Sequence, residues 1–457
     1  MERSGATLWP RADKEEGLAT LFVVSLIVGA AAGAVGASFR ASLYGAESLR
    51  DALVTWSHGA AWPGFFAVVG ACAIATAVAA RLVRRFAPPA SGSGIPHVEA
   101  VLHDQVPPAP YTLAPVKFAG GVLAIGAGLA LGREGPTVQM GASIAVLIGR
   151  IFRLPRSDYR VLLAAGAGAG LATAFNAPLA GAAFVLEELV QSFDRRITIS
   201  ALTASATAIA IARALLGDTL DFHVAALPDV PAEARPLFFA LGAVMGLVAI
   251  AYNHSLLRTL VAFERVPFPV EARAALIGAA VGALAWAHPG AVGGGDAITE
   301  GALAGGQGMQ LVALVFLVRF ALGAVSYAAA TPGGLFAPLL ALGAQFGLMF
   351  GWTCRWAIPG LDVAAQSFAL VGMAALFAGV VRAPLTGMVL VSEMTGNVTL
   401  LLQMLGACAA AMLVPTLLRD APIYESLREK LVGRPHDEAK AIPSPRAREE
   451  GQDERPA

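Results

Sequence analysis

The chain has 457 residues, of which 56% are hydrophobic and only 14% charged, and its mean hydropathy is +0.66. Soluble globular proteins carry about 25% charged residues, so this composition predicts a polytopic membrane protein. A formal net charge of zero excludes the nucleic-acid-binding classes. The apolar runs are continuous and do not alternate, which favours membrane helices and excludes a transmembrane β-barrel.

Residues 1–17 form a polar segment of mixed charge, without the basic-then-apolar layout of a signal peptide. The first charge-free run follows directly as Leu18–Ser38. Several arginines and lysines lie in residues 1–17 and again beyond Arg419. Because basic residues concentrate on the cytoplasmic side, both termini are predicted to be cytoplasmic. The last segment, residues 433–457, is predicted to be a short disordered tail.

A charged pair, Arg133-Glu134, lies between the charge-free runs 118–131 and 137–148. An ionisable side chain at membrane depth is costly, so it marks a functional site by default. The flanking glycines allow the backbone to leave helical geometry, and Pro136 suits the first turn of a helix. We therefore expect a broken membrane helix with a carboxylate at its amino terminus. The alternative is that Glu134 is only a structural ion-pair partner of Arg133.

The second half of the chain repeats landmarks of the first. Val116-Lys117-Phe118 recurs 202 residues later as Val318-Arg319-Phe320, and Ala177-Pro178-Leu179 recurs 206 residues later as Ala383-Pro384-Leu385. Further matches at these two offsets are Pro136 with Pro338 and Glu187 with Glu393. Matches in one order at two nearly equal offsets predict two homologous membrane repeats, residues 18–217 and 236–432.

The connector between the repeats, residues 218–235, contains four acidic residues and one arginine at its end. A connector poor in lysine and arginine is expected on the external side. With a cytoplasmic start and an external midpoint, each repeat crosses the membrane an odd number of times, so the second is inverted relative to the first. Inverted repeats are typical of secondary transporters, whose sites lie at the repeat interface.

Three short stretches share one design, in which glycine precedes proline at the start of an expected helix. They are Gly92-Ser93-Gly94-Ile95-Pro96, Gly132-Arg133-Glu134-Gly135-Pro136 and Gly334-Leu335-Phe336-Ala337-Pro338. A helix amino terminus exposes unpaired N–H groups, but one alone offers an anion only about 0.3–2 kcal/mol. Several converging termini can hold a desolvated anion weakly enough to release it. The three stretches therefore predict a small-anion pathway.

The cysteines and histidines give no sign of a metal site. Cys72, Cys354 and Cys408 lie far apart in apolar context, which predicts buried structural thiols. The seven histidines form no pair with ligand spacing. We therefore expect neither a metal nor another cofactor.

The motifs GSGIP, GREGP, AFNAPLAGAAFVLEE and GGLFAP resemble the CLC family of chloride channels and proton-coupled chloride transporters. The resemblance runs from about Leu18 to Leu431. It implies an all-α membrane protein of tilted and broken helices, surrounded by lipid. It also implies a homodimer with a separate pore in each subunit, and chloride and protons as the transported ions.

The resemblance assigns anion-binding roles to the punctuated stretches. It implies that the Ser93 and Tyr424 hydroxyls hold a central chloride, together with backbone amides near Leu335 and Phe336. Further chloride-binding residues, by the same resemblance, are Gly94, Ile95, Arg133 and Gly135, the last two through backbone groups of an outer site. Two plainer roles stay open: Ser93 as a helix cap and Tyr424 as an interfacial anchor.

Two glutamates are expected to handle protons. Glu134 matches the family's gating glutamate: when ionised it is itself an anion that blocks the outer site, and protonation frees that site for chloride. Glu188 matches the internal proton-transfer glutamate, which exchangers usually keep and channels usually lack; alternatively, it merely faces the cytoplasm. Glu187 is expected to have a structural or water-access role. His97, which follows GSGIP, is expected to be a solvated loop residue rather than a proton relay.

The resulting hypothesis is a chloride/proton antiporter of a bacterial inner membrane. The main alternative is a passive voltage- or proton-gated chloride channel on the same fold. Fluoride export is disfavoured, because that branch departs from the serine–tyrosine pair and from GREGP. A membrane enzyme with Glu134 or Glu188 as general base is disfavoured too, since no nucleophile–base pair, metal set or cofactor motif accompanies either residue.

Overall fold

The computed structural model describes residues 17–433 except residues 219, 223, 225–226 and 307. The expectations for residues 1–16 and 434–457 therefore lie outside the described residues. The described chain is helical, with two isolated backbone bridges, which confirms the all-α prediction.

The first half, in chain order, contains α1 (Leu18–His58), α2 (Ala61–Phe86), η1 (Pro88–Ala90), α3 (Ile95–Leu102), α4 (Leu113–Gly126), α5 (Glu134–Ile151), α6 (Arg156–Phe175), α7 (Pro178–Phe184), η2 (Val185–Leu189) and α8 (Arg195–Leu216). The second half contains η3 (Ala232–Ala234), α9 (Arg235–Glu264), α10 (Val270–Ala287), η4 (Pro289–Ala291), α11 (Asp296–Ala304), α12 (Met309–Tyr327), α13 (Phe336–Ala357), α14 (Ala365–Val381), α15 (Pro384–Thr395), α16 (Leu401–Leu417) and α17 (Ile423–Val432).

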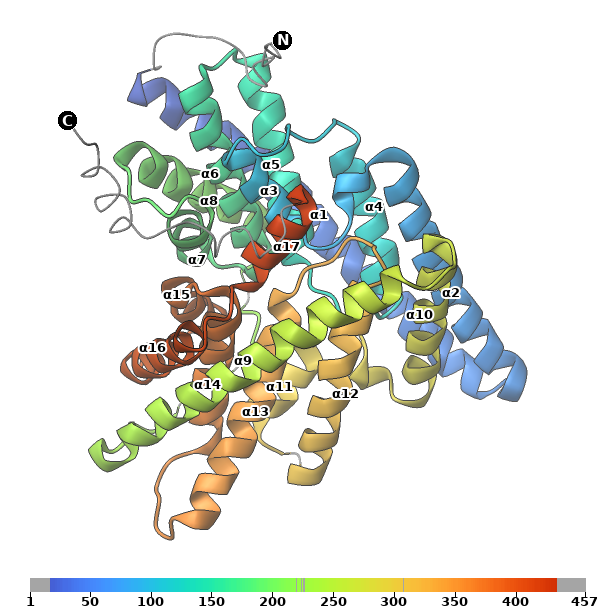
Figure 1. Ribbon diagram of the computed structural model, residues 1–457, viewed down its shortest axis with the longest axis vertical. Helices are drawn as coiled ribbons and strands as arrows, with labels where there is room; N and C mark the ends of the chain where they lie inside the picture. Colours follow the sequence, from blue (N-terminus) through green and yellow to red (C-terminus); the bar gives the residue numbers. More distant parts are fainter. Residues whose placement is uncertain (1–16, 219, 223, 225–226, 307, 434–457) are drawn as a thin grey trace, which may run out of the picture.

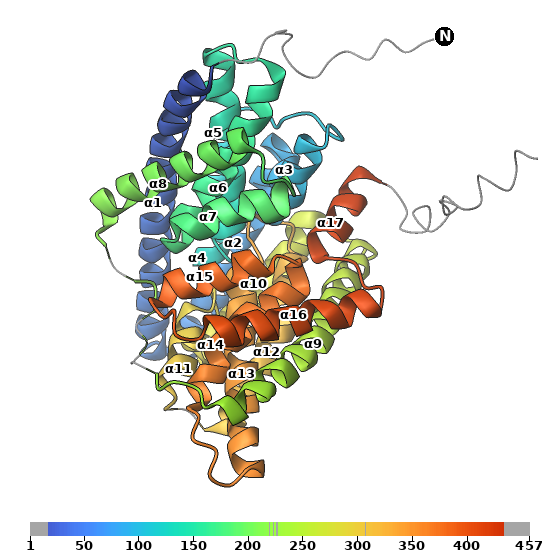
Figure 2. The same cartoon turned by 90° about the vertical axis from the view of Figure 1, so that its left-hand side faces the viewer.

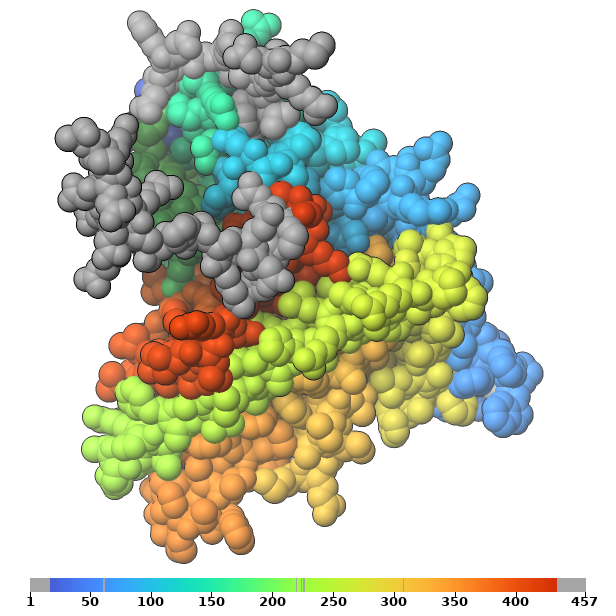
Figure 3. Space-filling view, viewed as in Figure 1, coloured from blue at the N-terminus to red at the C-terminus, as the bar shows by residue number. Residues whose placement is uncertain are grey.

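The helices lie at very different inclinations, as expected for tilted and broken membrane helices. In Figure 2, α1 follows one side of the molecule while α16 lies across it. Figure 3 shows α9 crossing one face as a long diagonal ridge. Among the described helices, seven are long and apolar enough to cross a membrane: α1, α2, α8, α9, α10, α12 and α13. The protein is therefore an integral membrane protein.

Several other helices are too short to span. Helices α3, α11 and α17 have 8, 9 and 10 residues. At 1.5 Å per residue, each covers about half of a 30 Å hydrocarbon core or less. Helix ends at membrane depth are tolerated only inside protein or at a water-filled cavity. Figure 1 accordingly shows α3 and α17 near the middle of the molecule, between the helices of the two halves.

Glycines let the central helices touch backbone to backbone. A Cβ on Gly141 of α5 would lie 2.2 Å from the carbonyl oxygen of Gly166 on α6. In the second half, a Cβ on Gly343 of α13 would lie 2.5 Å from the carbonyl oxygen of Gly372 on α14. Small residues at such crossings are the usual means of close helix packing in membranes. The same device therefore builds both central helix pairs.

Two glutamates bind the opposite halves to each other. Glu187 of η2 accepts hydrogen bonds from the backbone N–H groups of Leu385 and Thr386, at 2.9 and 2.7 Å. In the reverse direction, Glu393 of α15 accepts from the N–H of Leu179 at 3.0 Å, and also from the next residue of α7. Each carboxylate thus caps the first turn of a helix in the other half. The structural role expected for Glu187 agrees with these contacts.

In each half, a buried cationic side chain donates hydrogen bonds to backbone carbonyl oxygens. Lys117 of α4 donates to the carbonyl oxygens of Ala90 and Gly92, at 3.0 and 2.7 Å. Arg319 of α12 donates in the same way to the carbonyl oxygen of Gly293, at 2.7 Å. Each cation therefore satisfies buried carbonyls in the loop that precedes a short helix, α3 in one half and α11 in the other.

Candidate functional site

The three punctuated stretches meet at one place. Helices α3, α5 and α13 begin at Ile95, Glu134 and Phe336, inside the three stretches. Backbone hydrogen bonds join two of the preceding loops: Gly132 donates to Gly334 at 2.9 Å, and Gly334 donates back at 2.7 Å. The third loop is joined through a bridge between residues 92 and 332. Three helix amino termini therefore converge, as the sequence predicts.

The Glu134 carboxylate lies at the amino terminus of α13. Its Oε1 atom accepts a hydrogen bond from the backbone N–H of Phe336 at 2.6 Å, and the residue is fully buried. The space beside it is so narrow that a Cβ on Gly334 would lie 2.3 Å from the same oxygen. Glycine is required there, because any side chain would collide with the carboxylate. A carboxylate therefore lies directly at the amino terminus of α13, where the backbone N–H groups have no partner within the helix.

Ser93 and Tyr424 lie beside this carboxylate. A Cβ on Gly135 would come within 2.6 Å of Ser93 Oγ, so the first turn of α5 packs directly on Ser93. The Ser93 backbone N–H donates to the hydroxyl of Tyr327 at 3.2 Å. The ring of Tyr424 lies 5.8 Å from the ring of Phe336, measured between centroids. The structure therefore brings the predicted residues together around one buried point.

Three buried polar atoms of this cluster make no hydrogen bond within the described part of the chain. They are Ser93 Oγ, Glu134 Oε2 and Tyr424 Oη. Buried polar atoms are nearly always paired, so each exception calls for an explanation. Two hydroxyl groups and converging N–H groups are donors, and together they suit a small anion.

Arg133 turns away from Glu134. Its Nε donates to the carbonyl oxygen of Ala174 at 2.8 Å, and its Nη2 pairs with Asp221 at 3.2 Å. Asp296 is a second acidic neighbour, at 3.6 Å from Nη1. The alternative that Glu134 is the ion-pair partner of Arg133 is therefore wrong, because other carboxylates take that place.

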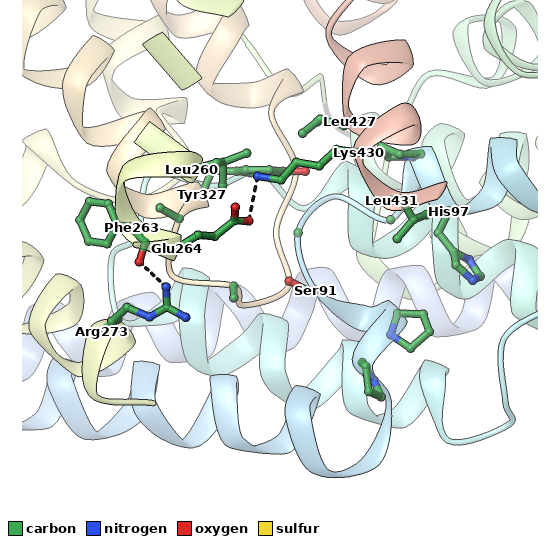
Figure 4. A pocket seen from close by; sticks show the side chains of 17 residues that line it. Ser91, His97, Leu260, Phe263, Glu264, Arg273, Tyr327, Leu427, Lys430 and Leu431 are labelled. Carbon is green, nitrogen blue, oxygen red and sulfur yellow. Dashed lines mark hydrogen bonds and ion pairs between the residues drawn. The ribbon is translucent and has the colours of Figure 1, made fainter. Parts of the chain in front are cut away.

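A cavity of about 450 Å³ reaches Gly92 and Gly94, the two neighbours of Ser93. Figure 4 shows the side chains that line it. Three charged side chains line it. Lys430 of α17 forms an ion pair with Glu264 of α9 at 2.8 Å, and Arg273 of α10 donates to a backbone carbonyl at the end of α9. The approach to Ser93 from this side thus carries two cations against one anion.

The expectation for His97 is wrong. His97 lies within the first turn of α3, is only 8% exposed, and lines the cavity that ends at Gly94 (Figure 4). Pro96 explains the difference, because proline in the first turn starts a helix and the next residue continues it. Helix α3 then packs against α5, α6 and α17, which buries the imidazole.

Glu188 lies apart from the Glu134 cluster. It belongs to η2, a single π-helical turn at the end of α7, and such turns often occur at functional sites. It lines a second, polar cavity of about 250 Å³, together with Glu99, Glu425 and Arg428. This cavity shares no lining residue with the one that ends at Gly94. Tyr424 lies within electrostatic reach of both Glu134 and Glu188.

A family model described as a voltage-gated chloride channel matches residues 75–416 of the chain. This chain belongs to the voltage-gated chloride channel family. The match covers the converging helix starts, Glu188 and the connector between the two halves. The resemblance stated from the motifs is therefore confirmed.

Curated relatives in the voltage-gated chloride channel family agree with this assignment. The H(+)/Cl(-) exchange transporter ClcA of Klebsiella pneumoniae subsp. pneumoniae is 37% identical over 443 residues, which covers 94% of this chain and 93% of the relative. A protein of the same name from Citrobacter koseri is 36% identical over 426 residues, with 91% and 89% covered.

The solved structures of the family share the fold. An X-ray structure of a slow cyanobacterial Cl-/H+ antiporter superposes with a TM-score of 0.87 at 31% identity, covering 92% of this chain and 99% of the other. The broken-helix architecture implied by the resemblance is thereby confirmed.

Proposed function

We propose that this chain is a secondary active antiporter that exchanges chloride for protons across a bacterial inner membrane. The observation that carries the proposal is the hydrogen bond from the Phe336 N–H to the Glu134 carboxylate. An acidic side chain occupies a helix end suited to an anion, so a proton and a chloride compete for one place. The relatives named as H(+)/Cl(-) exchange transporters support the same activity.

Glu134 is the external gate in this proposal. The ionised carboxylate makes a charge-assisted hydrogen bond with Phe336, which is stronger than a neutral one. A proton on the carboxylate removes the charge and weakens that bond. The side chain then swings out, and chloride accepts a hydrogen bond from the Phe336 N–H in its place. Return of the ionised carboxylate displaces the chloride, which couples the two ions.

Chloride is held without a full cation. The hydroxyls of Ser93 and Tyr424 and the backbone amides near Leu335 and Phe336 supply the central site. Backbone groups of residues 133–135 supply the outer site, and the α3 start at Gly94-Ile95 faces the inner approach. The charged groups nearest in sequence do not trap the ion, since Arg133 is paired elsewhere. Weak binding at successive sites is what rapid passage requires.

Glu188 transfers protons on the internal side in this proposal. It lines a cavity of its own, with Glu99, Glu425 and Arg428 on the walls. Chloride approaches through the separate cavity that ends at Gly94. Two inner openings allow each ion its own route, and the routes join near Tyr424.

We further propose the assembly and orientation that the family resemblance implies. Two copies form a homodimer, and each contains a complete pathway, since every site residue comes from one chain. The membrane repeats are residues 18–217 and 236–432, with residues 218–235 external and both termini cytoplasmic. The reciprocal contacts of Glu187 and Glu393 support this division, because an approximate two-fold axis between halves produces such exchanges.

Reversal potentials in reconstituted liposomes test the function. Under a fixed chloride gradient, an imposed pH gradient should displace the reversal potential of an antiporter. A reversal potential that follows chloride alone identifies a passive channel on the same fold and refutes the exchanger.

A further inference from the structure

The connector between the two halves inserts a buried carboxylate beside the gate. Asp221 lies in this connector, yet its side chain is only 6% exposed. It pairs with Arg40 of α1 at 2.9 Å and with Arg133 at 3.2 Å. Both guanidinium groups are themselves about nine-tenths buried. The buried Asp221 carboxylate thus forms ion pairs with two buried guanidinium groups.

We propose that Asp221 is a positioning residue for the Glu134 gate. By pairing with Arg133, it holds that guanidinium away from Glu134 and offsets part of its charge, so that the gate carboxylate can bind a proton and move. This proposal rests on the proposed function, because it assigns a control residue to the same gate.

The contacts of Arg133 show how firmly its direction is set. Besides Asp221, it binds the Ala174 carbonyl oxygen at 2.8 Å, the Tyr44 hydroxyl at 3.2 Å and Asp296 at 3.6 Å. Of the three acidic or carbonyl acceptors, Asp221 is the deeply buried charge, whereas the Asp296 side chain is 53% exposed. Asp296 and Asp221 both offset the Arg133 charge, and Glu47 of α1 lies within its electrostatic reach. Solvent weakens the exposed Asp296 pair, so Asp221 is the part of this compensation that is shielded from water.

The gate carboxylate itself has no basic partner among the described residues. Its Oε1 atom binds the Phe336 N–H, and Oε2 makes no hydrogen bond there. The other titratable groups in electrostatic reach are the phenols of Tyr252 on α9 and Tyr424 on α17, which ordinarily stay neutral below about pH 10. Arg133 is therefore the charged neighbour whose position determines how readily Glu134 binds a proton.

The position of Asp221 depends on how the connector docks. The next residue, Phe222, is 4% exposed, and its backbone N–H donates to the carbonyl oxygen of Met394 at 3.1 Å. Met394 lies near the end of α15, in the second half of the chain. The connector is thereby fastened to the second half while its carboxylate holds two arginines of the first half.

The sign of the effect follows from electrostatics. Loss of the Asp221 charge leaves Arg40 and Arg133 uncompensated and frees Arg133 to approach Glu134. Both consequences favour the ionised, blocking form of the gate, so a lower pH is needed to open it. A unit charge roughly 10 Å away, at an effective dielectric of about 20, displaces a titration by about one pH unit.

The experiment measures chloride flux from proteoliposomes between about pH 4 and pH 8. Asp221→Asn should move the flux midpoint to lower pH by about one unit. Arg40→Gln removes a cation from the same cluster and should move the midpoint in the opposite direction. A merely structural role would lower flux at all pH values without displacements of opposite sign.

A matched control comes from the same connector. Asp218 is 65% exposed and pairs with Arg213 at 3.1 Å, so Asp218→Asn should leave the midpoint unchanged. In a Glu134→Gln background, neither Asp221→Asn nor Arg40→Gln should alter the pH profile. An unchanged midpoint in Asp221→Asn overturns the proposal, as does a displacement that persists without Glu134. If Asp221→Asn does not assemble, the Arg40→Gln variant alone tests the proposal. An unchanged pH midpoint of chloride flux in Arg40→Gln then overturns it.

Failure of the underlying function looks different. If chloride flux keeps its full pH dependence in the Glu134→Gln variant alone, Glu134 is not the gate. That result refutes the proposed function, whatever the Asp221 variants do.

Discussion

Glu134 accepts its hydrogen bond from Phe336, the residue 202 positions later, and 202 is also the offset that relates the repeated sequence landmarks. Gly132 and Gly334, bonded reciprocally across the same place, differ by the same number. Residues that lie next to an approximate two-fold axis contact their own equivalents. Glu134 therefore lies close to the axis that relates the two halves, and transporters with inverted repeats hold their substrates at such an interface.

Neutralising the gate should uncouple the two ions. In Glu134→Gln the side chain keeps an oxygen but cannot carry the charge that competes with chloride. We expect proton movement to stop while chloride flux continues and loses its pH dependence. Simultaneous chloride-electrode and pH recordings from liposomes measure both. Glu300→Gln, on an exposed position of α11, is the control; persistent proton pumping in Glu134→Gln would remove the gate assignment.

Neutralising Glu188 should stop protons at the inner side. Glu188 lines a cavity separate from the one that ends at Gly94, so Glu188→Gln should leave the chloride route open. We expect proton movement to fall to background and chloride flux to continue. The same paired recordings apply, with the exposed Glu233→Gln as control. Unchanged proton pumping would mean that another group carries the inner step.

The glutamates that join the halves should matter for stability. Glu187 and Glu393 make equivalent bonds to helix amino termini, so Glu187→Gln and Glu393→Gln should destabilise the protein similarly. These donors are exposed or only partly buried, so the loss of each charged partner should cost about 1 kcal/mol. Thermal unfolding in detergent measures this. A large difference between the two variants would contradict the equivalence.

The narrow space at Gly334 should not tolerate a side chain. A Cβ there would lie 2.3 Å from Glu134 Oε1 and 2.8 Å from the Gly135 nitrogen. Overpacking of this kind costs about 1–3 kcal/mol, so Gly334→Ala should lower the unfolding temperature. Gly306→Ala is the matched control, because no atom lies within 4 Å of a Cβ at that exposed glycine. Equal stability of the two variants would show that the site is wider than described.

The ion pair that lines the cavity beside Gly94 should change the rate of chloride entry. Lys430→Gln leaves the Glu264 charge uncompensated at the approach to Ser93, and should slow chloride entry at low ionic strength. Glu264→Gln should accelerate it. We expect changes of about two- to fivefold that shrink as salt screens the charges. Initial rates at low and high ionic strength check this, and effects of equal sign in both variants would exclude an electrostatic origin.

Local chemistry let the sequence predict much of this protein. Continuous apolar runs predict membrane helices, because a chain that crosses the bilayer core must satisfy its backbone hydrogen bonds internally. The starts of α3, α5 and α13 follow from glycine and proline, which act on the backbone within a few residues. The matched offsets likewise identified Lys117 and Arg319 as equivalent positions, and their hydrogen bonds to backbone carbonyls agree.

Only the tertiary structure decided which distant side chains meet. No pattern in the connector distinguished the buried Asp221 from the exposed Asp218. The burial of His97 and the contact between Ser93 and Tyr327 were equally unforeseen. Hydropathy and backbone propensity operate over one or two helical turns, whereas these pairings join residues far apart in the chain. Their partners depend on how the helices pack, and packing is a property of the whole fold.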